Sequence, residues 1–77
     1  MKLEILSPEA TIYSGQAELV TLPGEQGLFT ILEHHAPIIS PLKVGAIIYT
    51  ANGQETRLDI EGGFVEAKNN VVTVCVA

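Results

Sequence analysis

Two adjacent histidines, His34 and His35, are the first residues of the sequence whose types could do chemistry. Imidazole nitrogens are common ligands of zinc and other transition metals. Neighbouring residues of an extended segment point to opposite sides, so these two rings cannot easily bind one ion. Further ligands would have to come from Glu25, Glu33 or Cys75, whose spacing matches no metal-binding pattern. The sequence therefore predicts no metal site, and a small metal-dependent β-barrel enzyme is kept as an alternative.

Lys68 is a second candidate, because it lies next to an expected hairpin turn at Asn69-Asn70. In lipoyl and biotinyl carriers, which are also small all-β domains, a hairpin lysine is acylated by the cofactor. Those carriers hold the lysine within the turn, between acidic or methionine residues, whereas Lys68 is expected at the end of a strand. Lysines at such positions are commonly solvated residues of a sheet edge. A carrier is therefore the alternative function, and an intact-mass measurement would detect the cofactor on Lys68.

Nucleophilic and phosphate-binding chemistry has no support in the sequence. None of the serines lies in a G-x-S-x-G context, and no glycine-rich loop precedes a helix. The acidic residues are dispersed, so no catalytic carboxylate pair is indicated. Cys75, the only cysteine, alternates with valines and is interpreted as a packed strand residue rather than a reactive thiol. The residues predict an interaction module with no catalytic, metal-binding or cofactor-binding site.

The length and composition indicate one small domain over residues 1–77. A chain of this size buries only about 60% of the surface that its unfolded form exposes. Hydrophobic residues make up 47% of the chain and charged residues 17%, which is typical of a globular protein. Because there are two Phe, two Tyr and no Trp, the core is expected to consist of Val, Ile and Leu.

The charge distribution argues against nucleic acid and membrane lipid as partners. Nine acidic and four basic residues give a formal net charge of −5, and the bases are scattered. No basic patch exists to neutralise phosphates, and no polybasic run or basic amphipathic helix exists to hold anionic lipid. The N-terminal residues, with Glu4 inside their apolar stretch, resemble neither a signal peptide nor a membrane anchor. A single cysteine is more typical of a reducing compartment.

Short apolar segments between turn residues predict that nearly the whole chain is β-strand. The second of these segments is interrupted at Ser14-Gly15 and ends at Pro23-Gly24. No window has the apolar periodicity of a helix. Many short strands with turns every eight to twelve residues indicate a β-sandwich or a flattened barrel. The first-half strands are expected at residues 3–5, 10–22, 28–32 and 38–42, with residues 33–37 as a connection.

Two hairpins of the second half have registers that follow from their turns. Asn52-Gly53 is a preferred pair for a type I′ turn, in which both central residues have positive φ. Asn69-Asn70 favours a similar turn, because Asn tolerates the left-handed region. Gly62-Gly63 between the hairpins permits a corner or a close backbone approach. The predicted buried residues are Ile47, Leu58, Val65, Val72 and Val74, and the mixed face that includes Ile48 is expected to meet water or a partner.

Residues 22–40, which read L-P-G-E-Q-G-L-F-T-I-L-E-H-H-A-P-I-I-S, resemble the signature of ATP synthase epsilon subunits. The family pattern is a turn with glycine, an acidic or polar pair, another glycine, an apolar run, and then H-A-P followed by apolar residues and Ser or Thr. Further segments resemble the family in the same order along the chain. These segments are residues 6–9, 12–15, 42–45, 62–66 and 70–74, with Ile47 and Tyr49.

The resemblance implies a flattened antiparallel β-sandwich of about ten short strands. It also implies a non-catalytic subunit of the central stalk, the rotor of a proton-translocating F-type ATP synthase. Such a subunit links the γ subunit to the c-ring, meets the α and β subunits only indirectly, and couples ion flow to ATP synthesis. Its expected location is peripheral, on the cytoplasmic face of the bacterial plasma membrane, without insertion into lipid.

The matched positions imply two contact sets, which we name by their expected partners. The γ-contact set consists of His35, Ala36, Pro37, Ile39 and Ser40. The c-ring-contact set is the turn Glu25, Gln26, Gly27 and Leu28.

This chain departs from the family pattern at two places. Some relatives have an acidic residue directly after the glycine of the turn, where this chain has Leu28 and leaves Glu25 as the nearest acid. Family members commonly continue into a helical hairpin that inhibits ATP hydrolysis, and residues 1–77 contain no counterpart of it. Inhibition and nucleotide sensing are therefore not assigned to these residues.

Overall fold

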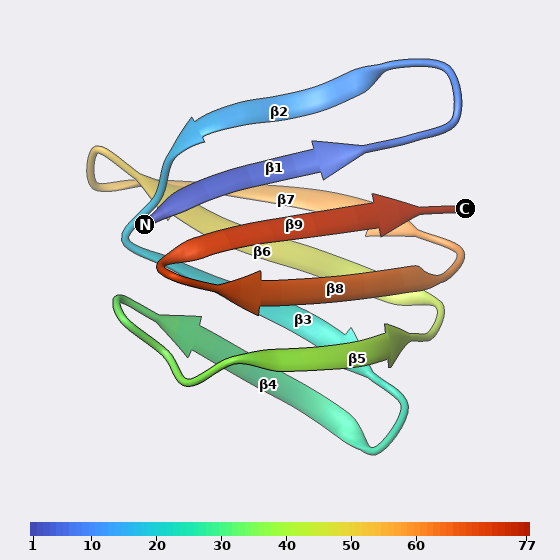
Figure 1. Cartoon of the computed structure of the whole chain (residues 1–77). Helices are drawn as coiled ribbons and strands as arrows, with labels where there is room; N and C mark the ends of the chain where they lie inside the picture. The colour runs from blue at the N-terminus through green and yellow to red at the C-terminus, as the bar shows by residue number, and fades with distance from the viewer.

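The chain folds into nine β-strands, and the computed structural model describes all residues from 1 to 77. Every strand is short and is separated from the next by a tight turn or a loop (Figure 1). No segment forms a helix with the length and apolarity that crossing a membrane would need. The strands are β1 (Lys2–Leu6), β2 (Thr11–Gln16), β3 (Leu19–Gly24), β4 (Gly27–Leu32), β5 (Ile38–Leu42), β6 (Gly45–Ala51), β7 (Gln54–Ile60), β8 (Gly63–Lys68) and β9 (Val71–Val76).

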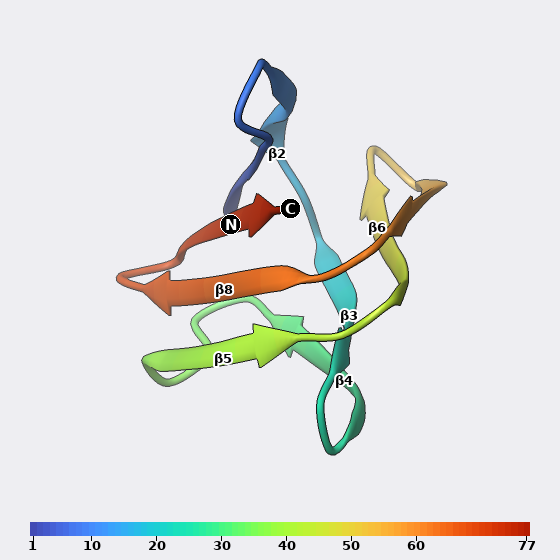
Figure 2. The same ribbon diagram turned by 90° about the vertical axis from the view of Figure 1, so that its right-hand side faces the viewer.

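The strands form two layers, as the perpendicular view in Figure 2 shows. One layer has the order β2-β1-β9-β8-β5, and the other has the order β4-β3-β6-β7. The layers join where Gly24 of β3 pairs with Leu42 of β5. All paired strands are antiparallel except β1 and β9, which are parallel. The predicted sandwich is confirmed, with nine strands in place of about ten and with one parallel pair.

Both predicted hairpin registers are confirmed. Ile47 lies opposite Leu58 across the β6–β7 hairpin, and Val65 lies opposite Val74 across the β8–β9 hairpin. The two turn residues of each hairpin have positive φ, with values of 54° and 74° at Asn52 and Gly53 and of 55° and 61° at Asn69 and Asn70. These are the angles of a type I′ turn, whose twist matches that of the flanking strands.

Strand β3 differs from its predicted course at both ends. The break before it is at Ala17-Glu18 rather than Ser14-Gly15, because the Ala17 N–H donates to the carbonyl of Met1 and the Ala17 side chain is buried. The strand also continues through Pro23-Gly24 and turns only at Glu25 and Gln26. Its pairing with β6 ends at Thr21, so Pro23 has no pairing partner in β6 and a residue without an N–H is tolerated.

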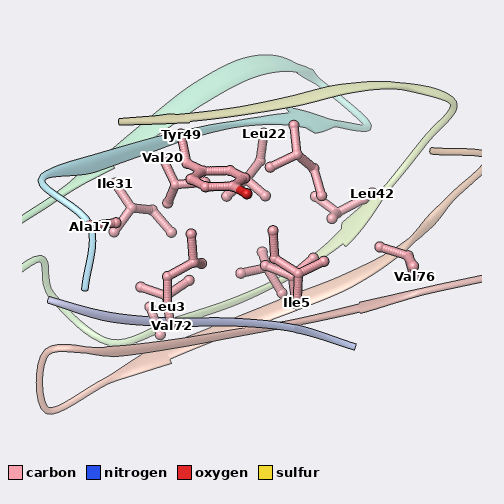
Figure 3. Close-up of a cluster of buried hydrophobic side chains, with 14 of the residues drawn as sticks. Leu3, Ile5, Ala17, Val20, Leu22, Ile31, Leu42, Tyr49, Val72 and Val76 are labelled. Carbon is pink, nitrogen blue, oxygen red and sulfur yellow. The ribbon is translucent and has the colours of Figure 1, made fainter. Parts of the chain in front are cut away.

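The core consists of 16 buried hydrophobic residues between the two layers, and no polar or charged residue is buried with them. In Figure 3 the side chains of Leu3, Ile5 and Val72 point from one layer toward Val20 and Tyr49 of the other. The buried residues alternate along β1, β8 and β9, as expected for a sheet with one covered face. The core therefore depends on aliphatic packing.

Leu58 is the exception among the predicted core residues. It is only half-buried, whereas Ile47, Val65, Val72 and Val74 are at most 1% exposed. Strand β7 is the last strand of its layer, so the opposite layer covers its inner face incompletely. The register of Leu58 was correct, and its burial was overestimated because a strand at the edge of a sheet has fewer neighbours.

Gly63 allows the close backbone approach that was expected at Gly62-Gly63. Its φ is 144°, and a Cβ at this position would collide with the carbonyl oxygen of Cys75. Only glycine can hold β8 this close to β9 at the start of their pairing.

We predict that Ile47→Ala lowers the free energy of unfolding by about 2–5 kcal/mol, the usual cost of truncating a packed aliphatic residue. Leu58→Ala, at the paired position of the same hairpin, should cost clearly less because Leu58 is already partly in water. Chemical denaturation of both variants checks this. Equal losses for the two would show that β7 is covered as fully as β6.

Candidate functional site

The two contact sets predicted from the sequence lie along one margin of the sandwich, formed by β4, β5 and their connections (Figure 1). The β4–β5 loop carries the first three residues of the γ-contact set, and β5 carries the other two. The c-ring-contact set forms the turn between β3 and β4 and the start of β4. All of these side chains are exposed or half-buried, so the fold leaves them available for contacts.

Strand β5 shows why the γ-contact set faces outward. Ile38 packs against the core, whereas Ile39 is 74% exposed, as expected for neighbours on a strand. Ile39 pairs with Glu66 of β8, and Phe64 on the same face of β8 is 50% exposed. A hollow of about 490 Å³ lies beside them. It is lined by Pro37, Ile38, Ile39, Glu66, Ala67 and Lys68.

The two contact sets meet at the other end of β5. A second hollow, of about 330 Å³, is lined by the β3–β4 turn on one side and by Ser40 and Pro41 on the other. Leu28 at this turn is 74% exposed, and Glu25 is exposed beside it. The margin is thus continuous, from the β4–β5 loop along β5 to the β3–β4 turn. It is mainly apolar along β5 and carries a carboxylate at the turn.

The β4–β5 loop has a tight conformation that begins at His34, whose φ is +60°. The His35 N–H donates to the Leu32 carbonyl at 3.3 Å, and the His35 ring nitrogen Nδ1 lies 2.7 Å from the carbonyl oxygen of Ala36. The two histidines therefore lie in a turn rather than on a strand, which corrects the extended conformation assumed in the sequence analysis. The His35 ring is held against its own loop and is exposed.

A set of polar contacts fixes the start of this loop, and we call it the clasp: Met1, Glu33, His34 and Asn70. The α-ammonium of Met1 donates to Glu33 Oε2 at 2.6 Å, and Asn70 Nδ2 donates to Glu33 Oε1 at 3.0 Å. The His34 N–H donates to Asn70 Oδ1 at 2.8 Å. The ammonium also donates to the buried carbonyl of Ala17 at 3.1 Å.

The clasp shifts the pKa of Glu33 below its usual value. The largest cause is the hydrogen bond from the α-ammonium, followed by the hydrogen bond from the Asn70 amide. Desolvation acts in the opposite direction but is outweighed. The carboxylate is thereby favoured in its charged form.

The other residues considered for chemistry are not brought together by the fold. The structure contains no group of three His, Cys, Asp or Glu side chains close enough to hold a metal ion. Lys68 is exposed at the end of β8, directly before the Asn69-Asn70 turn, as the sequence predicted. Cys75 is a free, half-buried thiol that faces away from the core, because Val74 and Val76 on either side of it point inward.

Sequence reasoning missed the clasp and the exposed position of Phe64. Glu33 and Asn70 are 37 residues apart, and no local pattern predicts a contact over that separation. Phe64 could have been found, because the predicted inward position of Val65 places its neighbour on the outer face.

We predict that Glu33→Gln lowers the free energy of unfolding at neutral pH and that this difference from the wild type shrinks in acid. A carboxylate with a lowered pKa stabilises the fold above its unfolded pKa, which is about 4.3, and this stabilisation is lost as the pH falls through the folded pKa. Denaturation at a series of pH values measures the difference. Glu55→Gln is the control, because Glu55 is exposed and has no ion pair. A pH-independent effect of Glu33→Gln would contradict the role of its charge.

The sequence matches a described family over its full length. The family is "ATP synthase, Delta/Epsilon chain, beta-sandwich domain", and the match covers residues 1–77. The ATP synthase epsilon chain of Desulfitobacterium hafniense (strain DSM 10664 / DCB-2) is 44% identical over 72 residues, which are 94% of this chain and 54% of that protein. The epsilon chain of Brevibacillus brevis is 39% identical over 75 residues, which are 96% of this chain and 57% of that protein. The chain thus spans little more than half the length of these relatives.

A solved structure shares the fold. A chain of the Euglena gracilis mitochondrial ATP synthase, in a structure of OSCP, F1 and the c-ring in rotational state 1, superposes with a TM-score of 0.90. It is 19% identical in sequence, and the match covers 96% of this chain and 48% of that chain. The sequence match, the relatives and the shared sandwich lead to one conclusion: this chain belongs to the family of ATP synthase delta/epsilon β-sandwich domains.

Proposed function

We propose that this sandwich is a non-catalytic part of the rotor of an F-type ATP synthase, where it links the γ subunit to the c-ring. The observation that carries the proposal is the family match over the whole chain, together with relatives named as epsilon chains. In this role the chain has no substrate of its own. It acts through its contacts, on the cytoplasmic face of the membrane and without entering the lipid.

The apolar part of the margin is the proposed contact with γ. Ile39 is a large hydrophobic residue left mostly in water, and Pro37 lies beside it on the wall of the same hollow. Burial of such a residue against a partner removes apolar surface from water, which favours association. Pro37 fixes its own φ and restricts Ala36 to an extended shape, so the segment loses little entropy on binding.

The β3–β4 turn is the proposed contact with the c-ring. It projects beyond the sandwich at one corner (Figure 1) and carries Leu28 and Glu25 at its exposed tip. Because Leu28 follows the glycine of the turn, the contact here combines an apolar side chain with one nearby carboxylate.

The connection between the two proposed contacts is well suited to transmit torque. The turn continues directly into β3 and β4, and β3 is tied to the end of β5 by the Gly24–Leu42 pairing. The Lys43 N–H also donates to the Pro23 carbonyl at 2.9 Å. A force applied at the turn therefore reaches β5 through backbone hydrogen bonds and covalent bonds, without crossing a flexible linker.

We expect Ile39→Asp to leave the fold intact and to weaken binding to purified γ subunit, because it places a charge in a contact that excludes water. Ile12→Asp is the matched control, since Ile12 is also exposed but lies on β2 at the opposite end of the layer. Circular dichroism and a γ-binding assay on the same samples test both. Wild-type binding by folded Ile39→Asp would place the γ interface elsewhere.

We also expect Leu28→Ala to weaken the association of this subunit with purified c-ring, with no loss of its folding stability. Leu32→Ala is the matched control, because Leu32 is 56% exposed on the same face of β4 but at its other end. Co-purification of each variant with the c-ring measures the effect. Equal retention of both variants would count against the β3–β4 turn as the contact.

A further inference from the structure

The β4–β5 loop, which carries the start of the γ-contact set, is not held by strand pairing. Residues 33–37 have no strand partner, and their only hydrogen bond between two backbone groups is that from the His35 N–H to the Leu32 carbonyl. The left-handed conformation of His34 is disfavoured for a residue with a side chain. A loop of this kind needs other contacts to keep one shape.

The clasp supplies those contacts from two distant parts of the chain. The N-terminus and the β8–β9 turn both lie at the same end of the molecule as this loop (Figure 1). Each oxygen of the Glu33 carboxylate accepts one hydrogen bond, from Met1 on one side and from Asn70 on the other. The same three residues are far apart in sequence, so the clasp ties the loop to both neighbours at once.

Asn70 has the central position because its amide group both donates and accepts. It donates from Nδ2 to Glu33 and accepts at Oδ1 from the His34 N–H, so it holds two consecutive residues of the loop. A carboxylate at this position could accept from the His34 N–H but could not donate to Glu33, since it has no N–H. The neighbouring turn residue Asn69 makes no side-chain hydrogen bond, although its φ is almost the same.

The clasp also reaches the γ-contact set directly. His35 borders a small hollow whose other walls include Met1 and Asn70. A movement of Asn70 or of the N-terminus therefore changes the space available to the His35 ring.

We infer that Glu33 and Asn70 are positioning residues, which hold the His35–Ala36–Pro37 part of the γ-contact set in its binding conformation. The inference rests on the proposed function, because it names residues that support the proposed γ interface without being part of it. Met1 of the clasp is buried, whereas the Glu33 side chain is 49% exposed and His34 is exposed, so the clasp connects the loop to the body of the sandwich at its surface.

The test compares Asn70→Gly with Asn69→Gly in the full chain. Glycine accepts the positive φ at both positions, so both variants keep the turn, and only the first loses the clasp. We expect Asn70→Gly to speed hydrogen exchange of the His34 amide by about tenfold, the effect of losing the hydrogen bond that this amide donates. The binding of purified γ subunit should weaken by a similar factor of about ten. Asn69→Gly should change neither.

Asn70→Asp tests the two hydrogen bonds of the Asn70 side chain separately, the one accepted from His34 and the one donated to Glu33. It keeps an acceptor for the His34 N–H but places a second carboxylate next to Glu33. We expect the His34 amide to stay partly protected and γ binding to fall between that of the wild type and that of Asn70→Gly. Strand amides of β8 and β9 should exchange at the wild-type rate in all three variants.

The possible results distinguish this inference from the proposed function. A His34 amide that stays protected in Asn70→Gly would overturn the clasp itself. An unprotected His34 amide with unchanged γ binding, in a series where Ile39→Asp does weaken binding, would overturn only the positioning role. If Ile39→Asp and Asn70→Gly both bind γ normally, the proposed γ interface fails, and the positioning role fails with it.

Discussion

The two layers pack against each other mainly through aliphatic side chains, because the interior of the sandwich contains no buried polar or charged residue. In a chain of 77 residues this leaves a narrow stability margin. Strands such as β1, β8 and β9 then place apolar side chains inward at alternate positions, which fixes the other positions on the outer surface. The exposed face of the molecule is thus a direct result of how its core is filled.

The margin formed by β4 and β5 shows this dependence most clearly. On β5 the buried Leu42 and the half-buried Ile38 anchor the strand, and the same alternation leaves Ile39 in water. The strand that carries the proposed γ contact is therefore held in place by the core. The loop before it is different, because it is held by charged and amide groups at the surface instead of apolar packing. The margin combines a stiff part and a part whose shape depends on a few polar contacts.

Much of the fold could be predicted from local chemistry in the sequence. Asn52-Gly53 and Asn69-Asn70 need positive φ, and this fixed both hairpin registers and the inward positions of Ile47 and Val65. The ends of β3 could not be predicted, since they depend on what lies beside the strand: Met1 at one end and the end of the pairing with β6 at the other. The contact sets came from the family resemblance, and they stay predictions. The clasp joins residues that no local rule relates.

The parallel pairing of β1 with β9 affects how the molecule can fold. The first strand lies between β2 and the last strand, so Leu3 and Ile5 reach their final surroundings only when β9 is present. During synthesis the β1–β2 hairpin leaves the ribosome before the other strands of this domain. Its apolar side chains stay exposed to water until β9 and the opposite layer have also been synthesised. Contacts over such long sequence separations also slow folding, because the chain must close a large loop before they form. The core around Leu3 and Ile5 can therefore be completed only after the last strand has been translated.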